Sequence, residues 1–484
     1  MTQPPPLETA QPETVQQETF DAIIIGSGQA GTPLASELGR AGQRVAIVER
    51  AHWGGTCVNE GCTPTKRMIA CAEAAHWARR AADYGVSLGG GEVKVDLARV
   101  RELKREIVAS FSAGSEKGLR DTPGVEAILG EGSFAGPQEI LVQTATGERR
   151  LTARQIFINT GCRPARPDIA GLELVPHLLD STSIMELDAV PDTLVVIGGS
   201  YIGLEFAQMY ARFGSRVTVL HRGRQLVDRE DPDVAASLLD ALRAEGLSIE
   251  LEVTGLRVEG AGDAVTVHFH TPDGAGQVQT RHLLAATGRT PNTEGLNLEA
   301  AGVKTDEHGF VPVDDALQTN VPGIWALGDV KGGPAFTHVS YNDFRRVRNT
   351  LLRGARPATA PPLVYTMFTD PQLGRVGLSE GEARGKGLDI LVATLPMTSV
   401  ARAIETQRTA GMMKAVVDRR THRILGATVL GPEGGEVAAA IQMAMLGDLP
   451  YTALRDAEIS HPTLAESLNN LFMTLKDGET QQQG

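Results

Sequence analysis

The sequence predicts an α/β protein that has two Rossmann-like dinucleotide-binding domains followed by an α+β domain. Residues 20–50 and 193–222 share one layout, in which an apolar run leads through a glycine-rich turn into a helical pattern and a second apolar run. After about residue 361 the sequence changes to alternating apolar runs with helical patterns behind them, which is typical of an antiparallel sheet with packed helices.

Length and charge exclude several classes of protein. A chain of 484 residues is too long for one hydrophobic core and should hold about three domains. The formal net charge of −13 argues against non-specific binding to nucleic acid or to an anionic membrane. The sequence has no apolar run of about 18 residues or more, and its first residues lack the pattern of a secretion signal. We therefore expect a cytoplasmic protein with no nucleic-acid or membrane partner.

The first glycine-rich turn is expected to bind a dinucleotide. Its three positions are Gly26, Gly28 and Gly31. Glycines let the backbone turn tightly, approach a pyrophosphate and pack the helix on the strand, while the helix N-terminus attracts phosphate charge. Glu49 ends the second apolar run, where it can accept a hydrogen bond from a ribose hydroxyl.

The second turn departs from this pattern. Its three positions are Gly198, Ser200 and Gly203, and we expect phosphates still to fit because serine is small. At the offset where the first unit has its acid, the second has His221, followed by Arg222 and Arg224. Basic residues there suit a 2′-phosphate, which favours NADPH over NADH. The alternative is that these residues form an ordinary solvated turn.

The stretch GGTCVNEGCTPTK, residues 54–66, places Cys57 and Cys62 among glycines. A zinc site would need two further ligands, and the sequence holds no second cysteine pair or Cys/His pair at a matching spacing, so no metal site is expected. A permanent structural disulfide is unusual in a reducing cytosol. The pair therefore favours redox catalysis, with zinc and a structural disulfide as the alternatives. Cys71 and Cys162 are expected to pack as small apolar residues.

The helix that follows these cysteines is expected to begin at Pro64, with Thr63 as its N-cap. A regular helix through both cysteines would hold them too far apart for a disulfide, so a bond requires an irregular start, which the neighbouring glycines permit. Cys62 would then lie beside the positive end of the helix and near Lys66. Both features lower the pKa of a thiol and favour the thiolate.

This stretch and the two turns together resemble the class I pyridine nucleotide-disulfide oxidoreductases, the flavoenzymes that include lipoamide dehydrogenase, glutathione reductase and mercuric reductase. The likeness runs from about residue 20 to 474 and is greatest to the mercuric-reductase-like branch. The further motifs that carry the family likeness are INTGCRP at 158–164, AATGRTPN at 285–292, TNVPGIWALGDV at 319–330 and HPTLAE at 461–466. The likeness to the mercuric-reductase-like branch rests on FTHVSYNDFR at 336–345, ARAIE at 401–405 and GPEGGE at 431–436.

The resemblance implies one FAD per subunit in the first site and NAD(P)H in the second, within a homodimer. The implied domains are an FAD-binding domain at 19–165 and 291–360, an NAD(P)H-binding domain at 166–290 and a C-terminal dimerisation domain at 361–474, between disordered tails at 1–18 and 475–484. Asp329 would contact the ribityl chain of FAD. The other candidate cofactor-binding residues in these motifs are Gly55, Thr56, Thr160, Gly161, Gly288 and Gly328.

The resemblance also implies a route for electrons. Hydride would pass from NAD(P)H through FAD to the Cys57–Cys62 disulfide, and from there to a disulfide or related small-molecule acceptor. Cys62 would be the thiolate that faces the flavin, and Cys57 the one that exchanges with the acceptor.

Four charged residues would assist that chemistry. Lys66 would lie beside the flavin N5, with Glu205 as its ion-pair partner. His461 and Glu466 would form an acid/base pair that acts across the dimer interface. A histidine can protonate a leaving thiolate, and a carboxylate can orient its ring.

The acceptor stays open at this point. Three departures from the mercury-specific members of the resembled branch weigh against Hg(II). The sequence ends without a cysteine pair and has no N-terminal Cys-x-x-Cys domain, and it keeps His461, a histidine that those members lack. The arginine pair of glutathione reductases and the NAD-selecting acid of dihydrolipoyl dehydrogenases are both missing. The main hypothesis is an NADPH-dependent disulfide or quinone-type reductase. The alternatives are a mercuric or other metal-ion reductase, a dihydrolipoyl dehydrogenase and an electron-transfer flavoprotein subunit.

Overall fold

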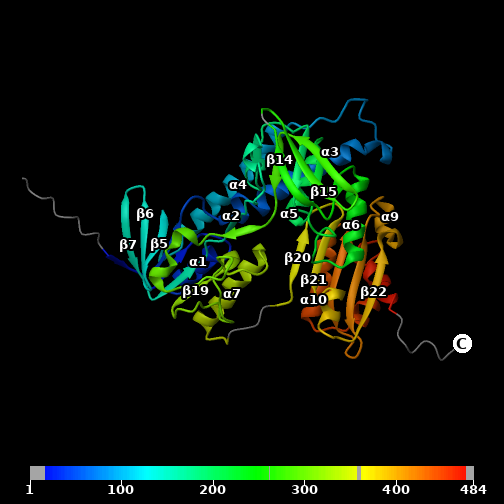
Figure 1. Ribbon diagram of the computed structural model, residues 1–484. Helices are drawn as coiled ribbons and strands as arrows, with labels where there is room; N and C mark the ends of the chain where they lie inside the picture. Colours follow the sequence, from blue (N-terminus) through cyan, green and yellow to red (C-terminus); the bar gives the residue numbers. More distant parts are fainter. Residues whose placement is uncertain (1–16, 261, 357–360, 476–484) are drawn as a thin grey trace, which may run out of the picture. The chain divides into compact units, whose positions relative to one another are not determined.

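Figure 1 shows the computed structural model, which describes residues 17–260, 262–356 and 361–475. The chain divides into two compact units. Unit 1 comprises Met1–Asn59, Val108–Arg163 and Thr290–Thr359, and unit 2 comprises Glu60–Ile107, Pro164–Arg289 and Ala360–Gly484. None of the helices in the described ranges is both long and apolar enough to cross a bilayer.

Unit 1 is built on a five-stranded parallel sheet. Its strands, in spatial order, are β19 (Ile324–Ala326), β8 (Gln155–Ile158), β2 (Ala22–Ile25), β3 (Val45–Glu49) and β4 (Val125–Leu129). One face, with Ala22 and Ile24, packs in a core with residues of α1 (Gly31–Arg40) and α7 (Thr337–Arg353). The other face, with Ile23 and Ile25, packs against a second sheet. Burial on both faces explains why these strands are continuous apolar runs.

The second sheet of unit 1 corrects one sequence expectation. Its strands are β1 (Gln17–Thr19), β7 (Gly147–Thr152), β6 (Glu139–Thr144) and β5 (Glu131–Gly136), of which β5, β6 and β7 lie together in Figure 1. Gln17 and Glu18 pair with β7, so they are not part of a disordered tail as expected. Arg149 holds Glu18 through two hydrogen bonds of 2.7 and 2.6 Å. The rest of that predicted tail lies outside the described residues.

Unit 2 contains the second Rossmann-like domain. Its parallel strands, in spatial order, are β10 (His177–Leu179), β17 (His282–Ala285), β11 (Thr193–Ile197), β12 (Arg216–Leu220) and β13 (Ser248–Glu250). One face packs with α3 (Cys62–Arg79), α5 (Tyr201–Phe213) and α6 (Pro232–Ala244). The other face packs with the antiparallel sheet of β14 (Thr254–Glu259), β15 (Val265–Thr271) and β16 (Gly274–Thr280).

The C-terminal part of unit 2 is the expected antiparallel sheet with helices. Its strands are β20 (Val364–Met367), β21 (Gln372–Gly377), β24 (Ile424–Gly431), β23 (Met412–Asp418) and β22 (Ile390–Pro396), in spatial order. The helices of this part are α8 (Glu380–Gly385), α9 (Ala401–Glu405), α10 (Gly434–Leu446), α11 (Tyr451–Arg455) and α12 (Ser467–Met473). The α/β class with a C-terminal α+β domain is therefore confirmed.

The remaining α-helices and strands of the described residues lie near the points where the chain passes between the units. They are α2 (Gly55–Asn59), α4 (Leu97–Arg120), β9 (Cys162–Pro164) and β18 (Arg289–Pro291). Residues 60–107 group with unit 2 and not with the glycine turn that precedes them. The assignment of 19–165 and 291–360 to FAD and of 166–290 to NAD(P)H stays a prediction.

The starts of two helices bear on the candidate catalytic residues, and one of them differs from the sequence prediction. The helix after the cysteines starts at Cys62 and not at Pro64, because the Thr65 N–H donates to the Gly61 carbonyl (3.1 Å) and closes the first turn there. The last helix, α12, starts at Ser467. There the Thr463 hydroxyl donates to the Ser460 carbonyl and accepts from the Glu466 N–H, which forms a turn before the helix.

The C-terminal tail also begins later than expected. Leu475 is only 9% exposed and packs in the core of the C-terminal sheet, so it belongs to the domain. Residues 476–484 lie outside the described residues.

A buried ion pair gives a test of this packing. The Arg375 guanidinium of β21 donates to the Glu230 carboxylate at 3.0 Å, and their side chains are 2% and 1% exposed. Arg375→Met leaves a buried carboxylate without this cation and should lower the free energy of unfolding by about 3 to 5 kcal/mol, measured by urea denaturation. Arg419→Met is the matched control, because Arg419 and Asp389 are exposed to 52% and 76%, and it should cost about 1 kcal/mol or less. Equal losses of unfolding free energy in the two variants would contradict the argument that burial makes the Arg375–Glu230 pair costly to break.

Candidate active site

The first glycine turn joins β2 to α1 and lies against the end of β8. Gly26 has a φ of 102°, and a Cβ there would lie 2.4 Å from the Asn159 carbonyl oxygen. A Cβ on Gly31 would lie 2.3 Å from the Gly26 carbonyl oxygen. No side chain fits at either position. Because α1 begins at Gly31, its N-terminus, the positive end of the helix dipole, lies at the turn.

Ser27 connects this turn to Glu49 and to the first cysteine. The Ser27 N–H and hydroxyl donate to Glu49 Oε2 at 3.0 and 2.7 Å, and the Ser27 hydroxyl accepts from the Gly54 N–H at 3.1 Å. Gly54 directly precedes α2, which carries Cys57. The buried Glu49 carboxylate thus fixes the turn through Ser27. The sequence alone does not reveal this contact between Ser27 and Glu49.

The other candidate residues of the first site gather at the same edge of the sheet. Parallel strands end at one edge, and β2, β8, β3 and β19 are followed there by Gly26, Asn159, Arg50 and Leu327. The Asn159 side-chain amide donates to the Gly26 carbonyl (3.1 Å), so the turn depends on it. The candidate residues found in unit 1 are Gly26, Gly28, Gly31, Glu49, Gly55, Thr56, Thr160, Gly161, Gly328 and Asp329.

Two motifs of the sequence meet in this region. The Thr160 hydroxyl donates to the Asn292 carbonyl (2.8 Å), and the Asn292 amide donates to the Thr160 carbonyl (2.9 Å). Beside them, the Gly328 N–H donates to the Asp343 carboxylate (3.0 Å), which also contacts Lys331 (3.3 Å). Burial raises the pKa of Asp343, against the opposing effect of Lys331. Asp343 was not identified from the sequence, because its contact depends on how α7 packs.

Lys66 and Glu205 pair as expected, within unit 2. Lys66 Nζ lies 2.8 Å from Glu205 Oε2, and Glu205 is 4% exposed. The second carboxylate oxygen of Glu205 accepts from the Phe368 N–H (2.8 Å), and the Phe368 ring centroid lies 4.7 Å from Lys66 Nζ. The ammonium group is therefore held by a carboxylate and an aromatic face, and Phe368 is a third member that the sequence did not reveal.

The second glycine turn repeats the geometry of the first. A Cβ on Gly198 would lie 2.3 Å from the Ala286 carbonyl oxygen, and one on Gly203 would lie 2.2 Å from the Gly198 carbonyl oxygen. Ser200 is exposed at the N-terminus of α5, and its side chain makes no capping hydrogen bond. Gly288 follows β17, where a Cβ would meet nothing within 4 Å.

The three basic residues after β12 do not act as one group. Arg222 and Arg224 are exposed, and Arg224 lies 3.4 Å from Glu252. His221 is buried at 7% exposure, and its Nδ1 accepts from the Gly199 N–H at 3.1 Å. A nitrogen that accepts a hydrogen bond carries no proton, so this contact does not fit the cationic role expected for His221.

His461 and Glu466 lie in contact in the turn before α12. His461 Nδ1 lies 3.0 and 2.9 Å from the two carboxylate oxygens of Glu466. When the carboxylate accepts a hydrogen bond from Nδ1–H, Nε2 is left as the nitrogen that can exchange a proton. The histidine side chain is 67% exposed, so a substrate can reach it.

Comparison with known proteins identifies the family. Residues 20–343 match the pyridine nucleotide-disulphide oxidoreductase model, and residues 363–472 match the dimerisation domain of the same family. The chain belongs to this family.

Several relatives cover almost the whole chain. The probable pyridine nucleotide-disulfide oxidoreductase RclA of Escherichia coli (strain K12) is 37% identical, over 94% of this chain and 99% of RclA. A mercuric reductase of Streptomyces lividans is 37% identical, over 93% of this chain and 94% of that protein. The solved Cu(II) complex of the HOCl-induced flavoprotein disulfide reductase RclA from Escherichia coli matches with a TM-score of 0.85 and 36% identity, over 95% of this chain and 100% of that chain.

Membership in the pyridine nucleotide-disulphide oxidoreductases makes the chain an NAD(P)H-dependent flavoprotein disulfide reductase. The first turn fits the FAD of this family. A Cβ on Gly55 would lie 2.7 Å from the Gly28 Cα, so the backbone at Gly55 lies closer to the turn than a side chain would permit. A glycine turn, a helix N-terminus and a buried carboxylate at the next strand end form a donor set suited to a nucleotide diphosphate and its ribose.

The cysteines lie on two consecutive helices. Cys57 is half-buried in α2, and Cys62 is exposed as the first residue of α3. The segment around Cys57 is therefore a short helix, whereas the sequence predicted an irregular segment only if the two cysteines form a bond. Burial raises the pKa of the Cys71 thiol, and Cys162 is buried, as packing residues would be.

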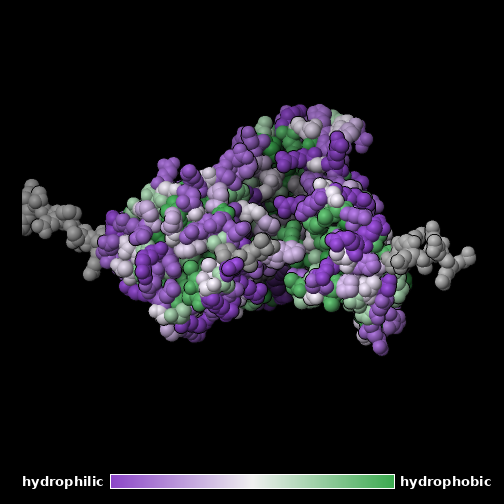
Figure 2. Space-filling model, turned by 90° about the horizontal axis from the view of Figure 1, so that it is seen from below, coloured by the Kyte–Doolittle hydropathy of each residue, from purple (hydrophilic) through white to green (hydrophobic). Residues whose placement is uncertain are grey.

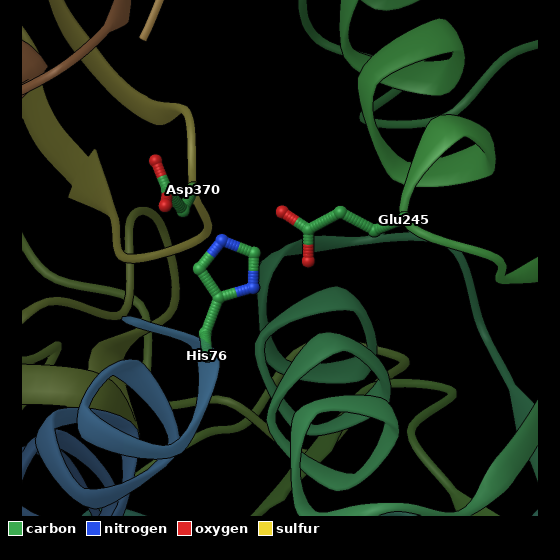
Figure 3. Close-up of side chains that lie close together, drawn as sticks. All are labelled: His76, Glu245 and Asp370. Carbon is green, nitrogen blue, oxygen red and sulfur yellow. The ribbon is translucent and has the colours of Figure 1, made fainter. Parts of the chain in front are cut away.

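Figure 3 shows a further group, formed by His76 of α3, Glu245 after α6 and Asp370 between β20 and β21. Their ligand atoms all lie within 4.8 Å of one another. Arg212 donates to Glu245 at 3.0 and 2.6 Å and to Asp370 at 2.9 Å, and Arg408 donates to Asp370 at 3.0 Å. Burial would raise the pKa of Asp370, but the two guanidinium groups lower it. These cations disfavour a metal ion, so the group is better described as an ion-pair network.

The close packing of the first turn gives a test. Gly26→Ala places a methyl group against the Asn159 carbonyl at a φ that alanine rarely adopts, which should weaken FAD binding by about tenfold or more. The flavin absorbance per chain of the purified protein measures this. Gly42→Ala is the control, because Gly42 also has a positive φ (88°) but a Cβ there meets nothing within 4 Å. Full flavin content in Gly26→Ala would refute the assignment.

Proposed function

We propose that this enzyme transfers electrons from NADPH, by way of FAD and a Cys57–Cys62 disulfide, to a small disulfide acceptor. The contact between His461 and Glu466 is the observation that supports a disulfide as the acceptor. Reduction of a disulfide by one NADPH and one proton yields NADP⁺ and two thiols, and each thiolate must gain a proton to leave as a thiol. A histidine oriented by a carboxylate is suited to give that proton.

The two cysteines would have different roles in the reaction. Cys62 begins α3, where the helix dipole favours a thiolate, so we assign it to face the flavin. Cys57 would attack the acceptor disulfide and form a mixed disulfide, which Cys62 then resolves. Bound FAD would supply the two-electron carrier between the nicotinamide and this pair.

Lys66 would provide fixed positive charge beside the flavin. Its ammonium is held by Glu205 at 2.8 Å and covered by the Phe368 ring, so it need not reorganise during the reaction. Glu205 is a positioning residue in this proposal, since it acts through Lys66.

The preference for NADPH rests on Arg222 and Arg224. Both are exposed on the segment after β12, where a 2′-phosphate of a nucleotide on the second turn would come near. No acid stands at the end of β12 to repel that phosphate, because His221 occupies the position.

We infer a homodimer in which His461 of one subunit serves the cysteines of the other. The dimerisation domain is present in the chain. Figure 2 shows apolar residues among the hydrophilic ones on the surface, and on α10 and α12 the exposed large ones include Met443, Leu446 and Met473. Apolar side chains that remain exposed on a domain of this kind are suited to a subunit interface.

A metal-ion reductase is the second candidate. Two relatives favour it: the solved RclA structure is a Cu(II) complex, and the Streptomyces lividans protein is named a mercuric reductase. Cys57 and Cys62 would then hold the soft ion as thiolates. Reduction of a metal ion needs no proton from His461, so this residue separates the two candidates.

His461→Gln should lower kcat with bis(2-hydroxyethyl) disulfide by about 100-fold or more, since an alkyl thiolate requires a proton to leave. With 5,5′-dithiobis(2-nitrobenzoate), whose aromatic thiolate leaves unprotonated, the same variant should lose less than about fivefold. NADPH oxidation in a steady-state assay measures both.

His308→Gln is the control, because His308 lies beside Glu307 at 3.6 Å and is 73% exposed but belongs to no candidate site. Unchanged turnover of the alkyl disulfide in His461→Gln would contradict the proposal. Turnover of Hg(II) or Cu(II) that exceeds turnover of both disulfides would favour the metal-ion candidate.

A further inference from the structure

The second glycine turn is held by the segment that follows β12. The Gly199 N–H donates to His221 Nδ1 at 3.1 Å, and the Gly199 carbonyl accepts from the Val227 N–H at 2.9 Å. Both polar groups at Gly199 are thus fixed by residues of one short segment. A Cβ on Gly199 would lie 2.7 Å from His221 Cγ, so the ring packs directly against the turn.

His221 itself is rigidly placed. Its backbone N–H donates to the Glu250 carbonyl (2.9 Å), and its carbonyl accepts from the Val253 N–H (3.0 Å). The ring is buried, and its Nε2 lies 3.4 Å from the Asp228 carboxylate, which accepts a hydrogen bond from the Nε2–H. With Nδ1 accepting and Nε2 donating, the imidazole is neutral.

Val227 is held in an unusual conformation at the same place. Its φ is 45°, a left-handed value that β-branched residues rarely adopt. Such a conformation persists only where the surroundings impose it, and here its N–H is the donor to Gly199.

The first turn shows the same arrangement with a different acceptor. There the N–H after the first glycine belongs to Ser27 and donates to Glu49 at 3.0 Å. Glu49 and His221 follow the same offset from Gly26 and Gly198 and bond the equivalent N–H. The second unit therefore keeps the hydrogen bond that shapes the turn but replaces a carboxylate by a neutral ring.

We propose that His221 is a positioning residue for the pyrophosphate-binding turn, and that it holds the Gly199 peptide without contacting the 2′-phosphate. This inference rests on the proposed function, in which the second turn binds the nucleotide. The fixed turn directs Ser200 and the N-terminus of α5 at the pyrophosphate, while Arg222 and Arg224 alone supply charge for the 2′-phosphate.

The test is calorimetric titration of the oxidised FAD-loaded enzyme with NADP⁺ and, separately, NAD⁺. His221→Ala should weaken both nucleotides by the same factor, about fivefold to tenfold, because the pyrophosphate is common to them. His221→Asn offers an oxygen near the position of Nδ1 and should restore most of the affinity. Arg222→Ala/Arg224→Ala should weaken NADP⁺ alone.

Kinetics and stability separate positioning from a general loss of structure. His221→Ala should raise the KM for NADPH by a similar factor with little change in kcat, and its melting temperature is compared with that of His221→Asn. A selective loss of NADP⁺ in His221→Ala would make the ring a direct ligand and overturn the inference, and so would unchanged binding of both nucleotides. A wild-type enzyme that binds neither nucleotide would overturn the proposed function as well.

Discussion

The close contact between a glycine and the carbonyl at the end of the neighbouring strand determines the geometry of both nucleotide-binding candidates. At Gly26 that carbonyl belongs to Asn159, and at Gly198 it belongs to Ala286. Each approach leaves less than 2.5 Å for a Cβ. Because the helix starts directly after this contact, its N-terminus and the ends of the parallel strands meet at one edge, where a phosphate can be bound.

The two turns also show how one scaffold can support different charges. Glu49 and His221 accept the equivalent backbone N–H, yet one brings a buried negative charge and the other none. Under the proposed function, holding the turn and selecting the nucleotide would fall to one residue in the first domain and to different residues in the second. In the proposed first site, the same carboxylate would hold the turn and meet a ribose. In the proposed second site, the ring would hold the turn, and the exposed Arg222 and Arg224 would recognise the nucleotide.

The sequence predicted the features that depend on local pattern. Glycine spacing and apolar periodicity predicted both Rossmann-like units and the C-terminal sheet. The pairs Lys66–Glu205 and His461–Glu466 were predicted from the family resemblance. Features that depend on tertiary packing were missed. Ser27, Asn159 and Asp343 act through residues distant in the chain. The helix start at Cys62 followed from a hydrogen bond to the Gly61 carbonyl that no capping rule indicates. The sequence also did not reveal that His221 is buried and accepts the Gly199 N–H.

The proposed function requires that electrons from NADPH reach the Cys57–Cys62 pair through the flavin. Anaerobic titration of wild type and Cys62→Ser with NADPH, followed by absorbance, tests it most directly. Two electrons per chain should produce a long-wavelength band from a thiolate against the bound flavin in the wild type, and Cys62→Ser should lack that band. Direct bleaching of the flavin in both proteins, with no band in either, would show that the cysteines are not coupled to it and would contradict the account.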